Sequence, residues 1–311
     1  MRVPFGPSPR KGIRELKGRV VVVSGAASGI GRALALGLWG KGCRLALVDL
    51  DEDGLVQLRA ELAGAGGGGA ATTHAADVGD RARMREVARE VVAAHGAVHV
   101  LINNAGIGHE AAFPQTTLDD WDRVVDTNLW GVIHGCHFFM PHLAKSDRAH
   151  IVNVSSLFGL VAVPGQSAYC ATKFGVRGLS ESLFEELRST SIGLTHVHAG
   201  ATGTNIMRSA KGDDPELMRR LVTWFDRHGI PPERVADRII RAIQKGTPRL
   251  LITPEVRLGD VLVRLLPGSA GRIISEAAIR IIGLEDVRVR RMEQWRETMV
   301  EGVPGSGGDA R

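Results

Sequence analysis

Cysteine, long apolar runs and clustered charge are all scarce in this chain, and each scarcity excludes a class of protein. Its 3 cysteines stand far apart without metal-ligand spacing, so we expect no disulfide framework, no metal site and a reducing, cytoplasmic location. No segment approaches the ~18 consecutive apolar residues that a membrane span needs, and none has the form of a signal peptide. Lys and Arg total 39 against 34 Asp and Glu, without long runs of one sign, which disfavours a nucleic-acid partner and leaves a small-molecule substrate as the expectation.

Tyrosine is scarcer still. The chain has a single tyrosine, Tyr169, in the stretch SAYCATKFG (167–175). Lys173 follows four residues later, and residues i and i+4 lie on the same face of a helix. A nearby ammonium favours the phenolate and lowers the pKa of a phenol, which would suit Tyr169 to acid/base catalysis. The pair alone is ambiguous, since an aromatic residue partly buried on an amphipathic helix is the common case.

The fold class follows from short β-branched runs that alternate with helical patterns from residue 18 onward. Strands are predicted at 19–24, 43–50, 72–76, within 98–106, and at 149–156, 193–200 and 248–253. Helices are predicted at 29–41, 52–63, 81–96, 118–144, 167–189 and 234–246. Strands spaced by such helices form βαβ units, so residues 18–254 are predicted to be a single doubly wound α/β domain with a mainly parallel sheet of about seven strands.

Four segments outside this pattern have separate interpretations. Residues 1–17 are basic and proline-rich and are expected to form a flexible arm, and the run 66–69 of glycines is expected to be a surface turn. Residues 255–311 are expected to form a helical extension, with two amphipathic helices over 261–283 and a disordered end, GVPGSGGDAR. This extension would serve as a subunit contact, a wall of the substrate pocket, or a weak membrane-surface contact.

Residues 205–232 supply apolar side chains at roughly helical spacing: Ile206, Met207, Leu217, Met218, Leu221, Trp224 and Phe225. One interpretation is a lid over a hydrophobic alcohol or ketone. The other is a helix that simply packs on the core.

A glycine-rich stretch, SGAASGIG (24–31), lies between the first predicted strand and the first predicted helix. In this setting Gly25 permits a tight turn, while Gly29 and Gly31 let the backbone approach a pyrophosphate at the helix N-terminus. Ser28 and Ile30 complete the predicted cofactor turn. The sequence therefore predicts a Rossmann-type dinucleotide site.

Two acidic residues at strand ends are candidate cofactor contacts. Asp49 stands 18 residues beyond Gly31, where a carboxylate accepts hydrogen bonds from the adenosine ribose and repels a 2′-phosphate. Because Ser28 and Leu50 also stand where a basic residue would meet that phosphate, we expect NAD rather than NADP. Asp77 would accept from the adenine amino group, with Val78 beneath the ring. The alternatives are a solvated acid at Asp49 and an ordinary turn aspartate at Asp77.

Further motifs appear in a characteristic order: NNAG (103–106), Asn128, and Ser155-Ser156 followed thirteen residues after Ser156 by Tyr169. With the glycine turn and TyrxxxLys, they resemble the classical short-chain dehydrogenase/reductase family over about residues 18–204. The resemblance implies that Tyr169 moves the hydroxyl proton, that Ser156 orients the substrate oxygen, and that Lys173 tunes Tyr169 and binds the nicotinamide ribose. It also implies that Asn128 loosens its helix and holds a water that links Lys173 to solvent.

The same resemblance assigns turn residues near the cofactor. Asn103, Ala105 and Gly106 are expected on the cofactor side, and Asn104 is expected to be structural. In HAGATGTN (198–205), Ala199 replaces the usual proline, Gly200 remains, and Thr204 is a candidate to bond the nicotinamide carboxamide, with Thr202 as its competitor.

Together these features predict an NAD-dependent oxidoreductase that transfers a hydride between the nicotinamide and a secondary alcohol or ketone, as a homodimer or homotetramer. The alternatives are an NADPH-dependent ketone or 3-oxoacyl-type reductase and a non-catalytic dinucleotide sensor. His196 and His198 share one face of a strand, but without a third ligand they do not indicate a metal site.

Overall fold

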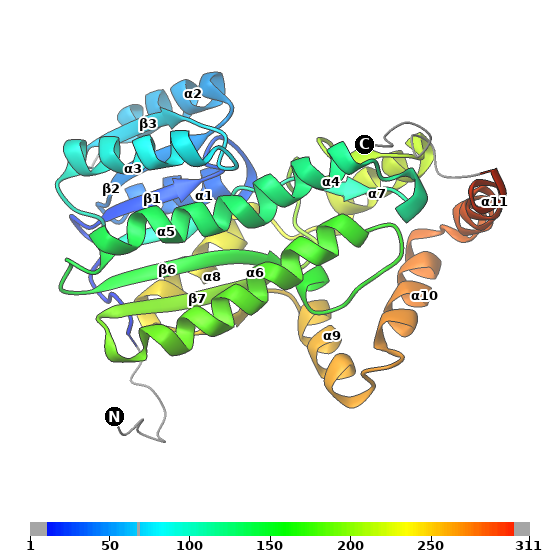
Figure 1. The fold of residues 1–311 in the computed structure, drawn as a ribbon. Helices are drawn as coiled ribbons and strands as arrows, with labels where there is room; N and C mark the ends of the chain where they lie inside the picture. Colours follow the sequence, from blue (N-terminus) through cyan, green and yellow to red (C-terminus); the bar gives the residue numbers. More distant parts are fainter. Residues whose placement is uncertain (1–10, 67–68, 302–311) are drawn as a thin grey trace, which may run out of the picture.

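The computed structural model describes residues 11–66 and 69–301 and shows a sheet layered between helices, with three further helices at one end (Figure 1). Part of the predicted arm (1–10), part of the glycine run (67–68) and the whole predicted disordered end (302–311) lie outside the described residues. Within the described part of the chain, no helix is both long enough and apolar enough to cross a membrane.

The central sheet has seven parallel strands in the order β3-β2-β1-β4-β6-β7-β9. Their bounds are Val20–Ser24 (β1), Arg44–Asp49 (β2), Ala71–Ala75 (β3), Val100–Asn103 (β4), Ala149–Ser156 (β6), Ile192–Ala199 (β7) and Arg249–Leu251 (β9). The predicted doubly wound fold is therefore confirmed. The strand order reverses direction between β1 and β4, and open α/β sheets bind ligands at the carboxyl ends of strands at such a point.

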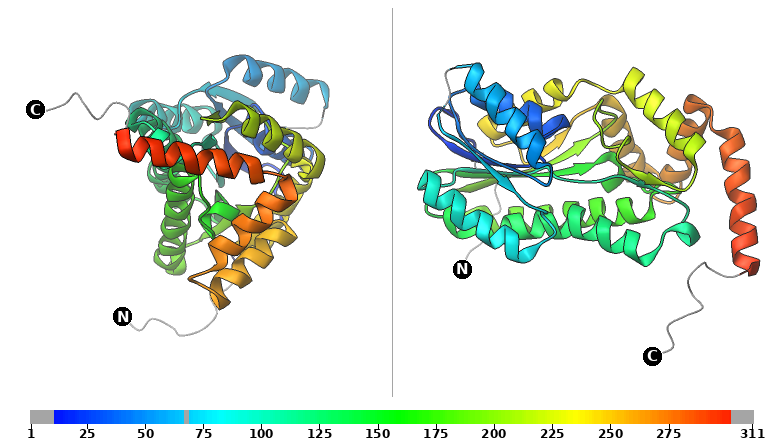
Figure 2. Two further views of the ribbon diagram at one scale, coloured as in Figure 1. Left: turned by 90° about the vertical axis from the view of Figure 1, so that its right-hand side faces the viewer. Right: turned by 90° about the horizontal axis from the view of Figure 1, so that it is seen from above.

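Helices cover both faces of the sheet because every second strand residue points to the opposite face. Val21 and Val23 pack toward α1 (Gly29–Trp39), α2 (Glu52–Gly64) and α8 (Pro232–Lys245), whereas Val22 packs toward the other side. That other side is covered by α3 (Arg81–His95), α5 (Gly131–Leu143) and α6 (Ser167–Glu186). Figure 2 shows the two layers edge-on.

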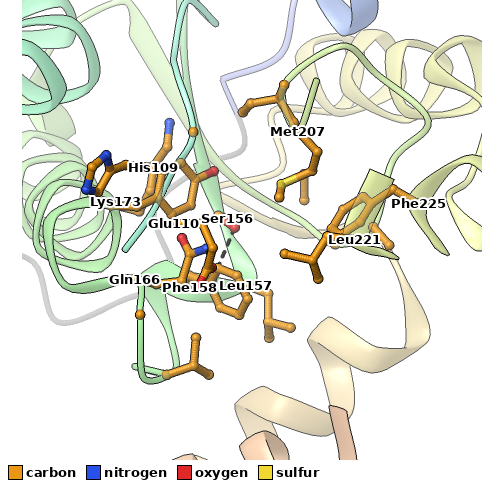
Figure 3. A pocket seen from close by; sticks show the side chains of 18 of the residues that line it. His109, Glu110, Ser156, Leu157, Phe158, Gln166, Lys173, Met207, Leu221 and Phe225 are labelled. Carbon is orange, nitrogen blue, oxygen red and sulfur yellow. Dashed lines mark hydrogen bonds between the residues drawn. The ribbon is translucent and has the colours of Figure 1, made fainter. Parts of the chain in front are cut away.

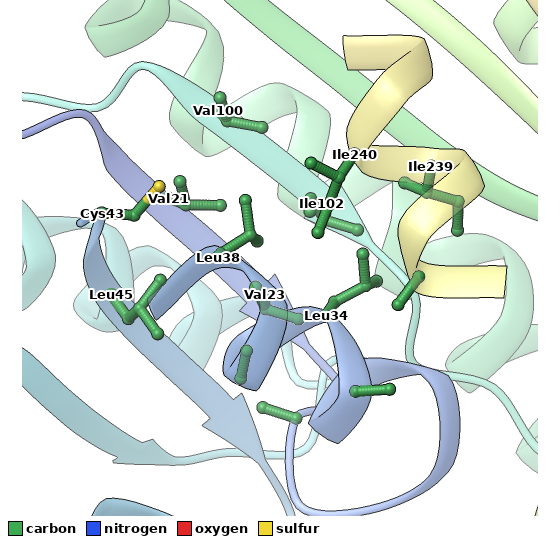
Figure 4. Close-up of a cluster of buried hydrophobic side chains, with 14 of the residues drawn as sticks. Val21, Val23, Leu34, Leu38, Cys43, Leu45, Val100, Ile102, Ile239 and Ile240 are labelled. Atoms are coloured by element: carbon green, nitrogen blue, oxygen red, sulfur yellow. The ribbon is translucent and has the colours of Figure 1, made fainter. Parts of the chain in front are cut away.

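The larger core cluster lies between β1, α1 and α8 (Figure 4). Leu34 and Leu38 of α1 are fully buried against Val23 and against Ile239 and Ile240 of α8. Because α1 begins at the glycine-rich turn, this packing fixes the position of the turn relative to the sheet.

The described part of the predicted arm, residues 11–17, is packed against the domain, and the prediction of a flexible segment is wrong there. Ile13 and Leu16 are each only 2% exposed. The Ile13 N–H donates to the Ile243 carbonyl over 3.1 Å, and the Lys11 ammonium donates to the Leu187 carbonyl over 2.6 Å. Two apolar side chains were enough to anchor a segment whose overall composition is basic.

The helix predicted over 118–144 is interrupted. It consists of α4 (Leu118–Val125), a π-helical turn η2 (Asp126–Trp130) and α5. Asn128 lies in the π turn and is fully buried. Short π turns within α-helices are often found at functional sites, and this one faces the cavity described below.

The remaining elements gather at the carboxyl end of the sheet. They are β5 (His109–Glu110), β8 (Lys211–Gly212), α7 (Pro215–His228), α9 (Pro254–Leu265), α10 (Ala270–Ile282) and α11 (Glu285–Glu301), with short 3-10 turns η1 (Phe113–Gln115) and η3 (Leu157–Gly159). A further 3-10 turn, η4 (Leu187–Ser189), lies at the other end of the sheet, before the start of β7. The two helices predicted over 261–283 correspond to the end of α9 and to α10, and α11 is a third helix in the described part of the extension. Gly66 and Gly69 of the predicted surface turn lie between α2 and β3.

Replacing Leu38 by alanine should lower the free energy of unfolding by about 2–5 kcal/mol, because the lost methyl groups leave a cavity between α1 and α8. Urea denaturation would measure the change. Leu118→Ala is the matched control, since Leu118 is 80% exposed and its truncation should change stability by less than ~0.5 kcal/mol. Equal losses in the two variants would contradict this description of the core.

Candidate active site

A single cavity of about 2000 Å³ opens at the carboxyl ends of the strands. Its lining runs from the glycine turn past the exit of β4 to Ser156, Tyr169 and Lys173, and then onward to α7 and α10. Figure 3 shows the far part of this cavity, with Ser156 and Lys173 on one side and Met207, Leu221 and Phe225 on the other. The cavity therefore brings the predicted cofactor turn and the predicted catalytic residues to one space.

The glycine turn has the shape that the sequence predicted. Gly25 and Gly29 adopt positive φ values of 66° and 52°, a conformation that other residues rarely adopt. A Cβ on Gly31 would lie 1.8 Å from the Gly25 carbonyl oxygen. Ser28 caps α1 without a side-chain capping bond, so its hydroxyl does not occupy the first N–H groups of α1, and Ser28, Gly29 and Ile30 line the cavity. This geometry suits a pyrophosphate at a helix N-terminus.

Asp49 lies beside this turn at the end of β2. One carboxylate oxygen accepts from the Ala27 N–H over 2.8 Å, and the other accepts from the Asp51 N–H over 3.1 Å. Asp49 lines the cavity and is half-buried, and the neighbouring Leu50 is 72% exposed. The carboxylate is thus held in place by two main-chain N–H groups.

Asp77 and Val78 form the next part of the lining. Asp77 is exposed, and one of its oxygens accepts from the Gly79 N–H over 2.8 Å, as in an ordinary aspartate turn. Val78 is only 5% exposed, and its carbonyl accepts from His134 Nδ1 over 3.0 Å. Both positions predicted for the adenine therefore lie at the cavity, and the turn bond uses part of the Asp77 carboxylate.

Of the two asparagines of the NNAG motif, Asn103 lies away from the expected cofactor side, whereas Asn104 has the structural role expected of it. Asn103 is buried outside the cavity lining, where its amide donates to Asn153 Oδ1 over 2.8 Å. Asn104 lines the cavity, and its amide donates to the carbonyls of Ser24 (3.0 Å) and Gly25 (3.2 Å). Asn103 is still part of β4, so its side chain lies within the sheet layers, while Asn104 braces the glycine turn.

Ala105 and Gly106 follow at the cavity surface. A Cβ on Gly106 would lie 3.1 Å from Asn128 Oδ1 and 3.3 Å from Lys173 Nζ. A larger residue would therefore press against both side chains, so Gly106 leaves space for the lysine to reach the site.

Asn128 ties the π turn to the loop after β4. Its Oδ1 accepts from the Ile107 N–H over 2.8 Å, and its Nδ2 donates to the Ile107 carbonyl over 2.9 Å. The same Nδ2 lies 3.4 Å from Thr172 Oγ1, on the helix that carries Tyr169. The side-chain amide therefore links three elements around the cavity.

The neighbouring serines at the end of β6 have different surroundings. Ser155 is buried, and its hydroxyl donates to the Lys173 carbonyl over 2.9 Å. Ser156 lines the cavity, and its hydroxyl accepts from the Phe158 N–H over 3.2 Å. Of the two, Ser156 has the hydroxyl that can face a substrate.

Burial dominates the electrostatics of Tyr169 and Lys173. It raises the pKa of Tyr169 to about 12, while a hydrogen bond with the Ser156 side chain acts in the opposite direction. Burial also lowers the pKa of Lys173 to about 8. The lysine Nζ donates to the Val154 carbonyl over 3.2 Å and lies 5.6 Å from the centre of the Tyr169 ring. The expected lowering of the Tyr169 pKa by Lys173 is therefore absent in this structure.

The segment after β7 completes the cofactor side. A Cβ on Gly29 would lie 3.1 Å from the Thr204 methyl group, which places Thr204 directly beside the glycine turn. Thr202 is 5% exposed, and its hydroxyl donates to the Gly200 carbonyl over 3.2 Å. Gly200, Thr202 and Thr204 all line the cavity. The hydroxyl of Thr202 is engaged in holding its own turn.

Sequence reasoning named His198 but missed its contact with the main chain of Ser156. His198 is fully buried on β7, and its Nδ1 donates to the Ser156 carbonyl over 2.9 Å. His196 Nδ1 lies 3.2 Å from His198 Nε2, and burial lowers the pKa of the two rings to about 3 and about 4 respectively. The pair is therefore neutral and positions the strand end. No group of three or more metal-ligating side chains occurs among the described residues.

Two more polar residues line the cavity without any sequence signal. Glu110 of β5 is 6% exposed, and it accepts a hydrogen bond from the Gln166 side chain at the start of α6. Glu110 lies in β5, which pairs with β8. A strand of two residues has no detectable periodicity in the sequence, so this carboxylate could not be predicted to line the cavity.

With this geometry described, the chain can be compared with known proteins. The family model for short chain dehydrogenases matches residues 19–215. The chain belongs to the short-chain dehydrogenase family. It is 41% identical over 266 residues to the SadH protein of Mycobacterium tuberculosis, which covers 83% of this chain and 95% of SadH.

Solved structures of this dehydrogenase family agree in fold. A short-chain dehydrogenase/reductase from Burkholderia phymatum in complex with NAD has a TM-score of 0.75 and 30% identity, covering 81% of this chain and 96% of that one. A metagenomic short-chain oxidoreductase in complex with NADP has a TM-score of 0.65 and 31% identity, covering 77% and 99%. The protein is thus an oxidoreductase of a family whose members bind NAD or NADP.

Lys173 should make stability depend on pH in a defined window. Its pKa is about 8 when folded, against about 10.4 for an unfolded lysine. Between these values the unfolded chain binds the extra proton, so the free energy of unfolding rises with pH, by at most about 1.4 kcal/mol per pH unit. Urea denaturation between pH 8 and pH 10 should show this rise in the wild type and its loss in Lys173→Met. Parallel curves for the two proteins would refute the lowered pKa.

Proposed function

We propose that this protein interconverts a hydrophobic secondary alcohol and its ketone with a nicotinamide dinucleotide, using Ser156, Tyr169 and Lys173 for acid/base catalysis. The observation that carries the proposal is their shared position on one cavity with the glycine turn at the start of α1. A chance helical Tyr/Lys pair would not explain a serine hydroxyl and a dinucleotide-type turn facing the same space.

The residues present fit a dinucleotide. Gly25, Gly29 and Gly31 form a cradle that any Cβ would fill or strain, and the exposed start of α1 suits an anionic pyrophosphate. Ile30, Ala105, Gly106, Gly200 and Thr204 line the adjoining wall. When bound, the cofactor would accept or supply the hydride.

The chain's own residues would handle the proton and the substrate oxygen. With a pKa of about 12, Tyr169 is protonated at neutral pH, so in ketone reduction its hydroxyl is the donor to the oxygen. Ser156 would hold that oxygen by a second hydrogen bond and stabilise the negative charge that develops there. Lys173 has donors beyond its bond to Val154, and these would orient the ribose and, when charged, favour the phenolate.

After ketone reduction the Tyr169 phenolate would regain a proton from solvent through Lys173 and the π turn at Asn128; in alcohol oxidation the proton would travel the opposite way. The side-chain amide of Asn128 is already engaged with Ile107, so its side chain acts by holding the turn in place. Water bound beside this turn would then connect the lysine with solvent.

The preferred cofactor would be NAD. The Asp49 carboxylate is held at the glycine turn by the Ala27 N–H, where it would accept from the ribose hydroxyls and repel a 2′-phosphate. Leu50 beside it offers no positive charge.

A hydrophobic substrate is supported by the wall opposite Lys173. Leu157 and Phe158 follow Ser156, and Met207, Leu221 and Phe225 face them across the cavity (Figure 3). Of the seven apolar residues predicted for a lid, all except Met218 line the cavity. The segment 205–232 would therefore cover the substrate as well as pack on its neighbours.

Removing the phenol should separate chemistry from binding. Tyr169→Phe should lose about 10²-fold or more in the rate of ketone reduction, because the proton donor is gone. Absorbance of the reduced nicotinamide, followed with a panel of ketones, would measure the rate.

The control for this variant is the dissociation constant of NADH, which should stay within about threefold of the wild-type value because the glycine turn is unchanged. An unaffected rate would contradict the catalytic role. A wild-type protein that binds NADH yet reduces no ketone in the panel would favour the sensor alternative.

The cofactor preference can be tested at Asp49. Fluorescence titration should show tighter binding of NADH than of NADPH to the wild type, and Asp49→Asn should narrow the difference by roughly tenfold because the charge repulsion is removed. Asp51→Asn is the matched control, since its carboxylate caps α2 through the Gly54 N–H. Tighter binding of NADPH to the wild type would overturn the preference.

A further inference from the structure

The helical extension is fastened to the domain at two separate places, and α10 spans the distance between them. At its first half, Ile274 packs with Val256 of α9 against Leu160 and Val161. At its second half, Ile279 and Ile282 pack with α7 and α11 around the buried Leu217 and Leu221. The extension is therefore docked at both ends of α10.

Ion pairs strengthen the second of these contacts. The Arg220 guanidinium of α7 donates to the Gly283 carbonyl over 2.8 Å and to an Asp286 oxygen over 2.7 Å. Arg290 of α11 lies 3.3 Å from the carboxylate of Asp214, the N-cap of α7. These contacts hold α7 and α11 together, so the wall that they form with α10 is a defined surface.

Beside the second of these contacts the cavity continues along α10. We name this part the extension groove and define it by six lining residues, Leu221, Trp224, Phe225, Ala278, Ile281 and Ile282. Ile281 is 69% exposed although it lines the cavity, which leaves an isoleucine without a partner on an otherwise apolar wall. Arg272, Ser275 and Glu276 are the polar side chains that α10 adds to the lining, and they precede the groove residues along the helix.

The size of the cavity leaves room for a long ligand beside a dinucleotide. Small-molecule sites usually occupy about 300–1,000 Å³, whereas this cavity has about 2000 Å³. Its lining on α10 extends from Gly271 to Ile282, a helical length of about 17 Å at 1.5 Å per residue. A dinucleotide on the glycine turn would leave this stretch uncovered.

We propose that the substrate carries a long, uncharged alkyl chain on one side of the reacting carbon and that this chain lies in the extension groove. The inference rests on the proposed function, because the groove is continuous with the cavity at Ser156 and Tyr169. That continuity identifies the substrate's own chain as the occupant. A second copy of the protein or a membrane surface would instead cover the outer face of α10 and would not affect the catalytic site.

The test compares methyl ethyl ketone, methyl hexyl ketone and methyl decyl ketone with the full-length protein. The specificity constant kcat/KM is measured with NADH. The dissociation constant of each ketone is measured by calorimetry with the NAD-bound protein, in which no hydride is available and the ketone cannot react. Until the groove is filled, each added methylene should raise kcat/KM and lower the dissociation constant, each by up to roughly fourfold. That factor corresponds to about 0.8 kcal/mol per buried methylene. Values independent of chain length would overturn the proposal.

Ala278→Phe would place a ring in the groove. It should weaken the binding of methyl decyl ketone and lower its kcat/KM roughly tenfold or more, while both values for methyl ethyl ketone stay within about twofold of the wild type. Val289→Phe is the matched control, because Val289 is 56% exposed on α11 and outside the lining, and it should behave as the wild type. The wild-type series stands by itself if Ala278→Phe fails to fold.

The remaining outcomes separate this inference from the proposed function. Binding that tightens with chain length while no ketone is reduced would support the groove and refute the proposed reaction. Ala278→Phe that alters the sedimentation coefficient or vesicle binding, but leaves the dependence on chain length unchanged, would show that a second copy or a membrane covers α10 and would overturn the proposal.

Discussion

The arrangement of the site depends on keeping one lysine almost completely out of water. Lys173 is 3% exposed, and an ammonium in that position loses most of its hydration. The Val154 carbonyl replaces part of that hydration, Gly106 leaves the necessary space, and Asn128 holds the adjoining loop. Strand β6, the exit of β4 and the π turn must therefore meet at fixed distances. The glycine turn belongs to the same assembly, because Asn104, in the loop that leaves β4, donates hydrogen bonds to the Ser24 and Gly25 carbonyls.

A desolvated lysine and a desolvated phenol favour their neutral forms, and this determines how the site can respond to ligands. Burial raises the pKa of Tyr169 to about 12 and lowers that of Lys173 to about 8, so the two values move apart. At neutral pH the phenol therefore keeps its proton, and the lysine ammonium is held less firmly than it would be in water. His198 contributes differently, since it remains neutral and fixes the main chain at Ser156. Burial thus sets the protonation of Tyr169 and Lys173, whereas His198 only holds a position.

The predictable part of this structure is the part governed by regular spacing. Strands and helices follow from β-branched runs and helical patterns, and the glycine turn and TyrxxxLys from the spacing of their motifs, and the cavity brings these motifs together as expected. The burial of Asn103 was missed because it depends on whether β4 ends one residue earlier or later. The contact of His198 was missed because its partner lies on another strand, and α11 because its apolar residues are sparse. The expected homodimer or homotetramer remains a prediction.

The attachment of α7 to α11 has a consequence for how ligands leave. The segment that covers the cavity is joined to the extension by the cluster around Leu217 and by Arg220, and through β8 it is joined to β5. A swing of α7 by itself would expose that cluster to water and separate its ion pairs with α11. A concerted swing would have to carry α10 and α11 as well, while α8 and β9, which lie between them in the chain, stay in the core and in the sheet. Opening at α7 is therefore opposed from both sides, and small molecules would pass with less displacement beside the exposed part of α10 at Ile281.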